Sequence, residues 1–254
     1  MSQKVAYVTG GMGGIGTAIC QRLHKDGFKV IAGCGPTRDH GKWLAEQKAL
    51  GYSFYASVGN VGDWDSTVEA FSKSKAEHGT IDVLVNNAGL AKGLSKFFDG
   101  DTDHWDQMID TNLKGLLYVS RTVVPGMIAQ GRGHVINIGS IAGKEVYDNG
   151  NVYCGTKFAV DAITKRMRLE LAVHGLKVTG IHPGAVETEF SVVRFDGDVD
   201  RANNVYKGFE NLVAEDIAEA IGFVVTRKPH VNINDLVIMP QAQAVAGVII
   251  RKES

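Results

Sequence analysis

The amino-acid sequence predicts an α/β fold in which seven parallel strands form one doubly wound sheet with helices on both faces. Short runs rich in β-branched residues alternate along the chain with longer segments of helical periodicity. The 31 glycines cluster at a few places, which is typical of tight strand-to-helix turns, and hydrophobic residues make up 44% of the chain, enough for a large core. A βα series of this kind implies a parallel sheet covered on both faces.

Each expected strand is a compact apolar run, and each expected helix is an amphipathic segment with a start or stop signal. The strands are expected at residues 4–9, 28–34, 52–57, 81–89, 133–140, 176–184 and 231–240. The helices are expected at residues 17–27, 43–51, 63–79, 104–131, 151–175 and 214–227. Asp63 or Asp65 starts one helix, Gly79 ends it, and Pro125 interrupts another late in its course. Residues 185–212 are irregular and long for a connection, so they are predicted to form a substrate lid.

Composition narrows the class of protein. Residues 1–254 show no linker, repeat or composition shift, so one catalytic domain is predicted. The formal net charge of -1 argues against a nucleic-acid partner. The three cysteines lack metal-ligand spacing, and no metal site is predicted. With no signal-peptide leader and no apolar run of about 18 residues, the chain is expected to be cytoplasmic, with no membrane partner.

A glycine-rich loop follows the first expected strand. The sequence TGGMGGIG (9–16) has the pattern TGxxxGxG, which lets the backbone approach a phosphate at a helix N-terminus. In this position of a doubly wound pattern it predicts dinucleotide binding, although glycines can also serve helix–strand packing alone. The expected cofactor contacts are Gly10, Met12, Gly14, Ile15 and Gly16.

The end of the second strand favours NADP(H) over NAD(H). The stretch AGCGPTRDHGK (32–42) has no acidic residue before Asp39 that would bind a ribose 2′-hydroxyl. Arg38 and Lys42 could each pair with a 2′-phosphate, Arg38 with two parallel hydrogen bonds. The alternative is that both are solvated surface cations. Gly35 and Arg38 are the cofactor candidates here.

Two further segments are placed along the cofactor. Asn60 and Val61, after the third strand, occupy the position where an adenine ring is expected to rest against the sheet edge. NNAG (86–89) follows the fourth strand at the topological switch point, which makes Asn87, Ala88 and Gly89 cofactor candidates. A polar turn stabilised by asparagine side chains is the alternative interpretation of NNAG.

Four residues predict a proton-transfer site. Tyr153 and Lys157 lie one helical turn apart, Ser140 follows the fifth strand, and Asn112 stands within a helix that it does not favour. A tyrosine acid/base near neutral pH needs a pKa about 3 units below 10, or about 4 kcal/mol. One ammonium about 4.5 Å away supplies nearly that much at an effective dielectric of about 20. Lys157 would thus lower the pKa of Tyr153 and bind cofactor ribose, Ser140 would hold the substrate oxygen, and Asn112 would keep a bent helix and a relay water. Taken alone, Tyr-x-x-x-Lys is commonly a helix-surface pair.

These motifs together resemble the short-chain dehydrogenase/reductase superfamily over essentially the whole chain. TGGMGGIG, NNAG, the four-residue set and HPG (182–184) match that family's order and spacing. The resemblance implies a Rossmann-type fold, hydride transfer between a nicotinamide and a carbonyl or alcohol, and a homotetramer or dimer. It also implies nicotinamide contacts from Pro183, Gly184, Val186 and Thr188.

The resemblance to subfamilies divides along the chain. Residues 1–90 resemble NADPH-dependent acetoacetyl-CoA reductases through VTGGMGGIGTAICQRL, AGCGP and GNVGDWDST. Residues 95–254 resemble NADP-dependent 3-hydroxy acid dehydrogenases acting on serine or 3-hydroxyisobutyrate, through GHVINIGSIAGKEVY, GNVYCGTK and HVNINDLVIMP among others. In a doubly wound sheet the first part builds most of the adenosine and phosphate site, and the second supplies catalytic residues and lid. Cofactor choice should then follow the first part and substrate choice the second.

The predicted activity is therefore NADP(H)-dependent interconversion of a short-chain 3-hydroxy acid and its 3-oxo form, with a homotetramer as the expected assembly. Ser140 and Tyr153 would contact the small-molecule substrate, and Arg194 in the lid would clamp its carboxylate. A salt bridge from Arg194 to Asp196, Asp198 or Asp200 is the alternative. Acetoacetyl-CoA reduction is the alternative activity, with Lys144 and Lys207 as basic residues near the rim.

Overall fold

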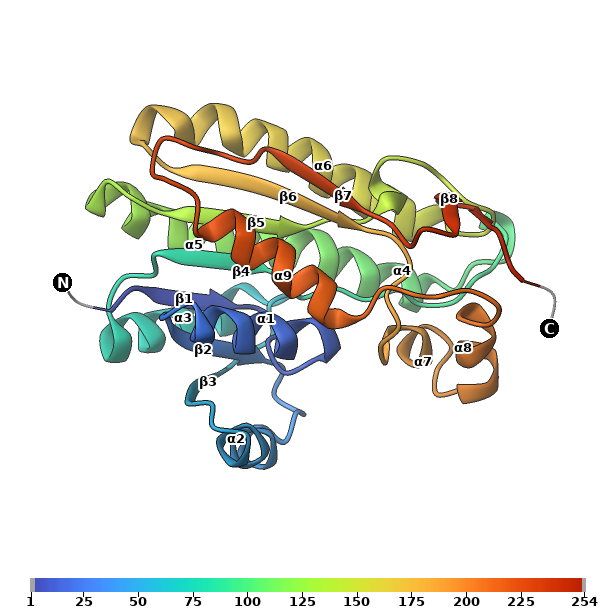
Figure 1. The fold of residues 1–254 in the computed structure, drawn as a ribbon, viewed down its shortest axis with the longest axis horizontal. Helices are drawn as coiled ribbons and strands as arrows, with labels where there is room; N and C mark the ends of the chain where they lie inside the picture. The colour runs from blue at the N-terminus through green and yellow to red at the C-terminus, as the bar shows by residue number, and fades with distance from the viewer. Residues whose placement is uncertain (1–2, 253–254) are drawn as a thin grey trace.

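A computed structural model describes residues 3–252 and contains the predicted sheet (Figure 1). The seven strands are parallel and run in the order β3-β2-β1-β4-β5-β6-β7. Their bounds are β1 Val5–Val8, β2 Lys29–Cys34, β3 Phe54–Val58, β4 Val83–Asn86, β5 His134–Ile138, β6 Lys177–Pro183 and β7 Asp235–Ile238. The order reverses between β1 and β4, so the loops after these strands diverge and leave a crevice at their carboxyl ends. The predicted fold class is confirmed.

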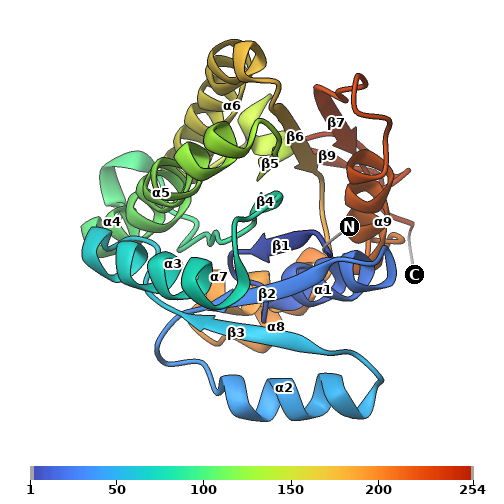
Figure 2. The ribbon, with the colours of Figure 1, turned by 90° about the vertical axis from the view of Figure 1, so that its left-hand side faces the viewer.

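Helices cover both faces of the sheet, as Figure 2 shows with the sheet seen end on. Their bounds are α1 Gly14–Lys25, α2 His40–Ala49, α3 Trp64–His78, α4 Thr102–Ile109, α5 Gly115–Gln130, α6 Asn151–Leu171, α7 Phe190–Arg194, α8 Val199–Val205 and α9 Ala214–Val225. Residues of α1 and α9 pack with one face of the strands in one buried cluster, exemplified by Ile19, Ile136 and Ile221. Residues of α3, α5 and α6 form the other cluster, which includes Phe71 and Val119. Both faces of the sheet are buried, which explains the nearly continuous apolar character of the central strands.

The long helical segment after β4 departs from the prediction in two ways. A π-helical turn at Asp110–Lys114 separates α4 from α5, where one continuous helix was expected. Pro125 lies inside α5 and does not end it, because the helix continues to Gln130. Proline removes one backbone donor, and the buried Val123 and Met127 on either side of it hold this stretch of α5 against the sheet.

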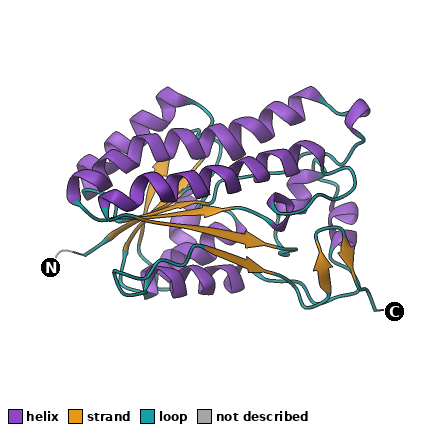
Figure 3. Ribbon diagram, turned by 90° about the horizontal axis from the view of Figure 1, so that it is seen from above, coloured by secondary structure: helices purple, strands orange, loops and turns teal. Residues whose placement is uncertain are grey.

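The C-terminal third contains elements that periodicity did not predict. The last strand is limited to Asp235–Ile238, because residues 231–234 carry no strand pairing. Two short strands, β8 Gln243–Val245 and β9 Val248–Ile249, form an antiparallel hairpin beyond the end of the sheet (Figure 3). The irregular segment 185–212 contains the short helices α7 and α8, which lie below the carboxyl ends of the strands in Figure 1.

No helix within residues 3–252 is both long and apolar enough to cross a membrane. The single catalytic domain over residues 1–254, the cytoplasmic location and the homotetramer stay predictions.

Candidate active site

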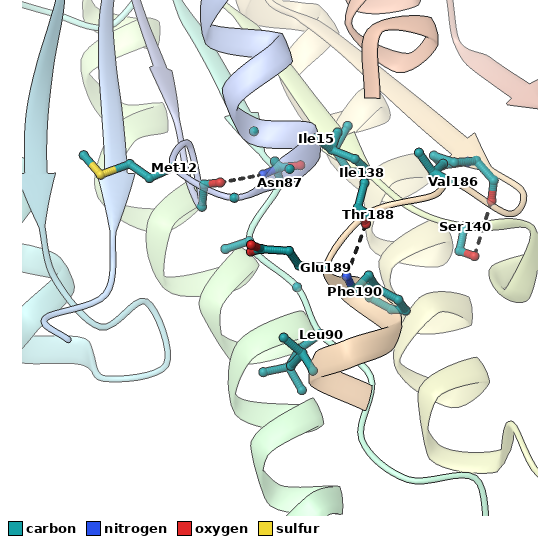
Figure 4. A pocket seen from close by; sticks show the side chains of 18 of the residues that line it. Met12, Ile15, Asn87, Leu90, Ile138, Ser140, Val186, Thr188, Glu189 and Phe190 are labelled. Carbon is teal, nitrogen blue, oxygen red and sulfur yellow. Dashed lines mark hydrogen bonds between the residues drawn. The ribbon is translucent and has the colours of Figure 1, made fainter. Parts of the chain in front are cut away.

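A cavity of about 360 Å³ opens at the carboxyl ends of the strands, and residues from many parts of the chain line it (Figure 4). Almost every predicted cofactor residue is among them. The predicted residues in its lining are Gly10, Met12, Gly14, Ile15, Gly16, Gly35, Arg38, Asn87, Ala88, Gly89, Ser140, Tyr153, Lys157, Pro183, Gly184, Val186 and Thr188. The cavity therefore lies at the topological switch point, where a doubly wound sheet binds its ligand.

The glycine loop has the shape of a phosphate cradle. Helix α1 begins at Gly14 after the extended Gly13, and no side chain caps its first turn. The unpaired N–H groups of that turn and the positive end of the helix dipole face an anion placed in the cavity. A Cβ at Gly16 would lie 2.0 Å from the carbonyl oxygen of Gly10, so only glycine permits this tight turn. Gly14 lies against Thr188 of the lid, where a Cβ would come within 3.0 Å of its side chain.

Arg38 lines the cavity beside the glycine loop. Its Nη2 donates to the carbonyl oxygen of Met12 at 2.7 Å, which orients the exposed guanidinium along the loop. Lys42 does not line the cavity and lies in the first turn of α2, where its backbone N–H donates to Asp39. Of the two candidates for a 2′-phosphate, the structure places only Arg38 at the cavity.

The NNAG turn is fastened to the glycine loop. Asn87 Nδ2 donates to the carbonyl oxygens of Thr9 at 2.9 Å and Gly10 at 3.1 Å, and Figure 4 shows the second of these bonds. The Thr9 hydroxyl in turn accepts from the backbone N–H groups of Asn87 and Ala88. Asn87 is thus both a turn-stabilising residue and a lining residue, so the two interpretations of NNAG coexist.

Tyr153 and Ser140 both line the cavity. Ser140 begins a 3-10 turn at Ile141–Gly143, its Oγ accepts from the N–H of Ala142 at 3.1 Å, and it donates weakly to the carbonyl oxygen of Pro183 at 3.5 Å. Tyr153 lies in the first turn of α6, half-buried, with its ring edge-on to Phe190 at 5.8 Å between centroids. The lid helix α7 therefore packs directly on the predicted acid/base.

The electrostatics of Tyr153 correct one prediction. Burial raises the pKa of Tyr153, while the Arg194 guanidinium and a hydrogen bond with Ser140 lower it. Lys157, which was expected to lower this pKa, lies 5.9 Å from the ring centroid and donates to the carbonyl oxygen of Ile138 at 2.9 Å. Because desolvation disfavours both charged forms, burial also lowers the pKa of Lys157 to about 8. Tyr153 is consequently a neutral phenol near neutral pH, the form that can donate a proton.

Asn112 is buried within the π-helical turn and does not line the cavity. Its amide exchanges two hydrogen bonds with the backbone of Leu90, each 2.8 Å long, and donates to Thr156 Oγ1 at 3.2 Å. Asn112 thereby ties the segment after NNAG to α6. The sequence indicated a special role for Asn112 because asparagine is unfavourable inside a helix.

Arg194 lies beside Tyr153 but is not among the residues that line the cavity. Its guanidinium carbon is 5.4 Å from the Tyr153 ring centroid and 5.9 Å from that of Phe190. Its Nη2 donates to the Tyr147 hydroxyl, and its buried Nε has no partner. The alternative of a salt bridge to a lid aspartate is wrong for Asp196, which pairs instead with Lys92 at 2.5 Å and with His104. Among the described residues Arg194 takes part in no ion pair, and its guanidinium contacts aromatic rings instead.

Two predicted cofactor residues lie outside the cavity lining, and several lining residues were not predicted. The backbone N–H of Asn60 donates to Ser66 Oγ, and Val61 packs against Gly115. Their adenine contact stays a prediction. The unpredicted lining residues are Gly13, Cys34, Leu90, Ile138, Gly139, Glu189, Phe190 and Val193. Most of them adjoin a predicted residue, so extending each motif by one position would have found them.

Comparison with known proteins places this geometry among hydride-transferring enzymes. The profile of the short chain dehydrogenase family matches residues 4–198. An acetoacetyl-CoA reductase of Cupriavidus necator is 48% identical over 190 residues, which cover 74% of this chain and 77% of the relative. An NADP-dependent 3-hydroxy acid dehydrogenase of Salmonella typhimurium is 41% identical over 249 residues, or 98% of this chain and 99% of the relative. The closed form of a serine dehydrogenase complexed with NADP+ superposes with a TM-score of 0.90 at 41% identity, covering 98% of this chain and 100% of that one.

Proposed function

The chain belongs to the short-chain dehydrogenase family, and from this premise we propose that it interconverts a short-chain 3-hydroxy acid and its 3-oxo form. It is an NADP-dependent oxidoreductase, like the relatives that match it over nearly its full length. The relatives named for free hydroxy acids cover 98% of the chain, whereas the acetoacetyl-CoA reductase match covers 74%. That difference in coverage supports the free acid as substrate.

The observation that carries the proposal is the Arg194 guanidinium, which lies next to Tyr153 and has no carboxylate partner among the described residues. A partly buried cation without a carboxylate partner is costly, and its fork of donors matches a carboxylate. Nε has no partner, and the group lies 5.4 Å from the Tyr153 ring centroid. A substrate whose hydroxyl carbon is two bonds from a carboxylate can reach both groups at once. In this proposal Arg194 binds the substrate carboxylate, and Tyr153 exchanges the proton of the substrate hydroxyl.

Each catalytic side chain has a separate task in this proposal. When bound, NADP(H) donates or accepts the hydride at the substrate's hydroxyl-bearing carbon. Ser140 Oγ holds the substrate oxygen, and Tyr153 Oη gives its proton to that oxygen during reduction. Lys157, held by the Ile138 carbonyl, presents its ammonium at the cavity wall for the cofactor ribose. Asn112 fixes the backbone of Leu90, which lines the same cavity.

Cofactor choice is assigned to Arg38. Its guanidinium lines the cavity next to the glycine loop, and the second strand ends without an acidic residue in that lining. A 2′-phosphate placed beside Arg38 meets a cation that can bind it with two hydrogen bonds. Arg38 is therefore proposed to select NADP(H).

Reduction of acetoacetyl-CoA is the second candidate, favoured by the 48% identity to a named reductase. A coenzyme A thioester needs basic residues near the rim for its phosphates. Lys144 is not free for that role, because its Nζ lies 2.6 Å from Asp161 Oδ1. Lys207 is exposed, and its backbone carbonyl is held by Arg251.

The proposal is tested by comparing substrates in the wild type and in Arg194→Met. We expect NADP+ reduction with serine or 3-hydroxyisobutyrate to exceed NADPH oxidation with acetoacetyl-CoA. In Arg194→Met, KM for the free acids should rise about 10- to 150-fold, because a charge-assisted pair worth about 1.5–3 kcal/mol is lost. Turnover of the thioester, which lacks that carboxylate, should change little.

Arg201→Met is the matched control. Arg201 is another lid arginine, but its side chain is exposed and its guanidinium carbon lies 4.2 Å from the Phe195 ring centroid rather than beside Tyr153. This variant should keep the wild-type KM. Wild-type activity confined to acetoacetyl-CoA, or an equal loss on both substrate classes in Arg194→Met, would contradict the free-acid proposal.

A further inference from the structure

Four side chains form a compact polar cluster behind the turn that carries Ser140, outside the cavity lining. They are Lys144, Asp161, His182 and Asp235, called here the rear cluster. Asp161 and His182 are buried, and Lys144 and Asp235 are partly buried. Each residue comes from a different segment: the end of the 3-10 turn, α6, β6 and β7. The cluster therefore connects these four segments.

On the helix side, the rear cluster fastens the Ser140 turn to α6. Lys144 directly follows the 3-10 turn that Ser140 begins, and its Nζ lies 2.6 Å from Asp161 Oδ1. Asp161 is one turn beyond Lys157 on the same face of α6. Gly143 fits against the backbone of Lys157, where a Cβ would lie 2.5 Å from its carbonyl oxygen. The turn carrying Ser140 is therefore fixed to the helix that carries Tyr153.

On the sheet side, His182 of the rear cluster packs against Gly139, the residue before Ser140. His182 Nε2 lies 3.1 Å from Asp235 Oδ1, and since a carboxylate only accepts, Nε2 carries the hydrogen. The other nitrogen, Nδ1, is buried without a partner and faces Gly139, where a Cβ would lie 2.4 Å from it. The next residue, Pro183, offers its carbonyl oxygen to the Ser140 hydroxyl. The imidazole thus sets where the end of β5 lies.

The charges of the cluster are balanced by the protein itself. Lys144 Nζ is also 3.9 Å from Asp235 Oδ1, so one ammonium lies between the two carboxylates. Lys165 and Arg168 add outer cations, at 2.7 Å from Asp161 and 3.4 Å from Asp235. Burial lowers the pKa of His182, so the imidazole is neutral near neutral pH. Asp161, His182 and Asp235 offer ligand atoms within 4.8 Å of one another, but Lys144 already supplies the cation there.

We propose that Lys144 and His182 are positioning residues, which through Asp161 and Asp235 set the place of Ser140 relative to Tyr153. Their effect should fall on kcat, because a displacement of about 1 Å in a group that holds the reacting oxygen costs up to about 100-fold in rate. The proposal rests on the catalytic role proposed for Ser140, and it is independent of which substrate is used.

The test compares two lysines that bind the same carboxylate. Lys144→Met removes the contact from the Ser140 turn, and Lys165→Met removes the contact of an exposed lysine on α6 itself, at 2.7 Å from Asp161 Oδ2. We expect kcat about 10-fold lower in Lys144→Met with unchanged NADPH affinity. In Lys165→Met, kcat should stay within about twofold of the wild type, as for a surface ion pair. Lys144→Arg should restore most of the lost activity.

Gly139→Ala supplies a second, independent perturbation. The added methyl group displaces the His182 imidazole, which hydrogen-bonds Asp235, and leaves Lys144 in place, so kcat should fall about 10- to 100-fold. Lys144→Met and Gly139→Ala are each assayed with two substrate pairs, 3-hydroxyisobutyrate with NADP+ and acetoacetyl-CoA with NADPH. Calorimetry measures the Kd of each variant for NADPH. Ser140→Ala is the reference: if it keeps full turnover, the proposed mechanism fails before the cluster is judged.

Equal kcat values in Lys144→Met and Lys165→Met, together with full turnover in Gly139→Ala, would overturn the positioning role. So would parallel losses of kcat, NADPH affinity and melting temperature in Lys144→Met, because these indicate a general loss of structure. A fall in kcat alone, reversed by Lys144→Arg, supports it.

Discussion

His134 begins β5 at the amino end of the sheet, whereas His182 lies near the carboxyl end of the neighbouring strand β6. Both imidazoles are buried, both use Nε2, and both leave Nδ1 without a partner. His134 bonds a neutral hydroxyl, Thr179 Oγ1, at 2.8 Å, and burial lowers its pKa to about 3. His182 instead faces the carboxylates of Asp235 and Asp161.

Under the proposed mechanism, the two ends of the sheet serve stability and function separately. At the amino end, a titratable group is neutralised by burial and joined only to neutral partners. At the carboxyl end, charged groups are collected, paired and placed against the turn that carries Ser140. Changes at the carboxyl end should therefore alter turnover or cofactor binding, and changes at the amino end should alter only stability.

The largest expected effect at the carboxyl end is that of Tyr153→Phe. Loss of the phenol hydroxyl removes the proton donor, so kcat should fall about 10²- to 10⁴-fold. NADPH affinity and the melting temperature should stay near the wild-type values, because the ring keeps its packing against Phe190. Tyr55→Phe, at an exposed position of β3, is the control. Full turnover in Tyr153→Phe would show that the proton passes through another group.

Gly16→Ala should act on cofactor binding. A Cβ there would lie 2.0 Å from the Gly10 carbonyl oxygen and 2.8 Å from Gly11 Cα, so the glycine loop must shift. Overpacking of this kind costs about 1–3 kcal/mol, which corresponds to a rise of about 5- to 150-fold in the NADPH Kd measured by calorimetry. Gly41→Ala in α2 adds a methyl group with only Asp39 Oδ1 nearby, at 3.7 Å, and should leave the Kd unchanged. An unchanged Kd in Gly16→Ala would mean that the loop does not hold the phosphates.

The sequence predicted the site best where a backbone conformation requires particular residues within a short segment. The glycine loop, NNAG and the spacing of Tyr153 and Lys157 could be read because glycine turns, asparagine turns and helix periodicity act over a few residues. The rear cluster could not be predicted, because Lys144, Asp161, His182 and Asp235 are brought together only by the packing of α6 on β6 and β7.

The same limit explains two wrong details. The lowering of the Tyr153 pKa by Lys157 assumed an ammonium about 4.5 Å from the phenol at an effective dielectric of about 20. The structure instead directs the ammonium of Lys157 to the Ile138 carbonyl, and burial raises the pKa of the phenol. The orientation of Arg194 depends on the path of the lid backbone, which sequence periodicity does not fix. Burial and long-range direction are tertiary properties, and they decide pKa values more than spacing does.

His134→Gln is expected to have the smallest effect on turnover. Its effect should fall on the pH dependence of the free energy of unfolding. The folded state holds His134 neutral with a pKa of about 3, so it binds fewer protons than the unfolded chain below pH 6.5, the ordinary value. Stability from this group is therefore complete above pH 6.5 and is lost as the pH falls toward 3, amounting to about 2 kcal/mol between pH 7 and pH 5. Glutamine can still donate to Thr179 but does not titrate, so the free energy of unfolding, measured in urea, should decline less in the variant over that range. His230→Gln, at an exposed position, is the control and should follow the wild-type curve. If kcat at pH 7 fell in His134→Gln, the amino end would be coupled to catalysis and the contrast between the two histidines would not hold.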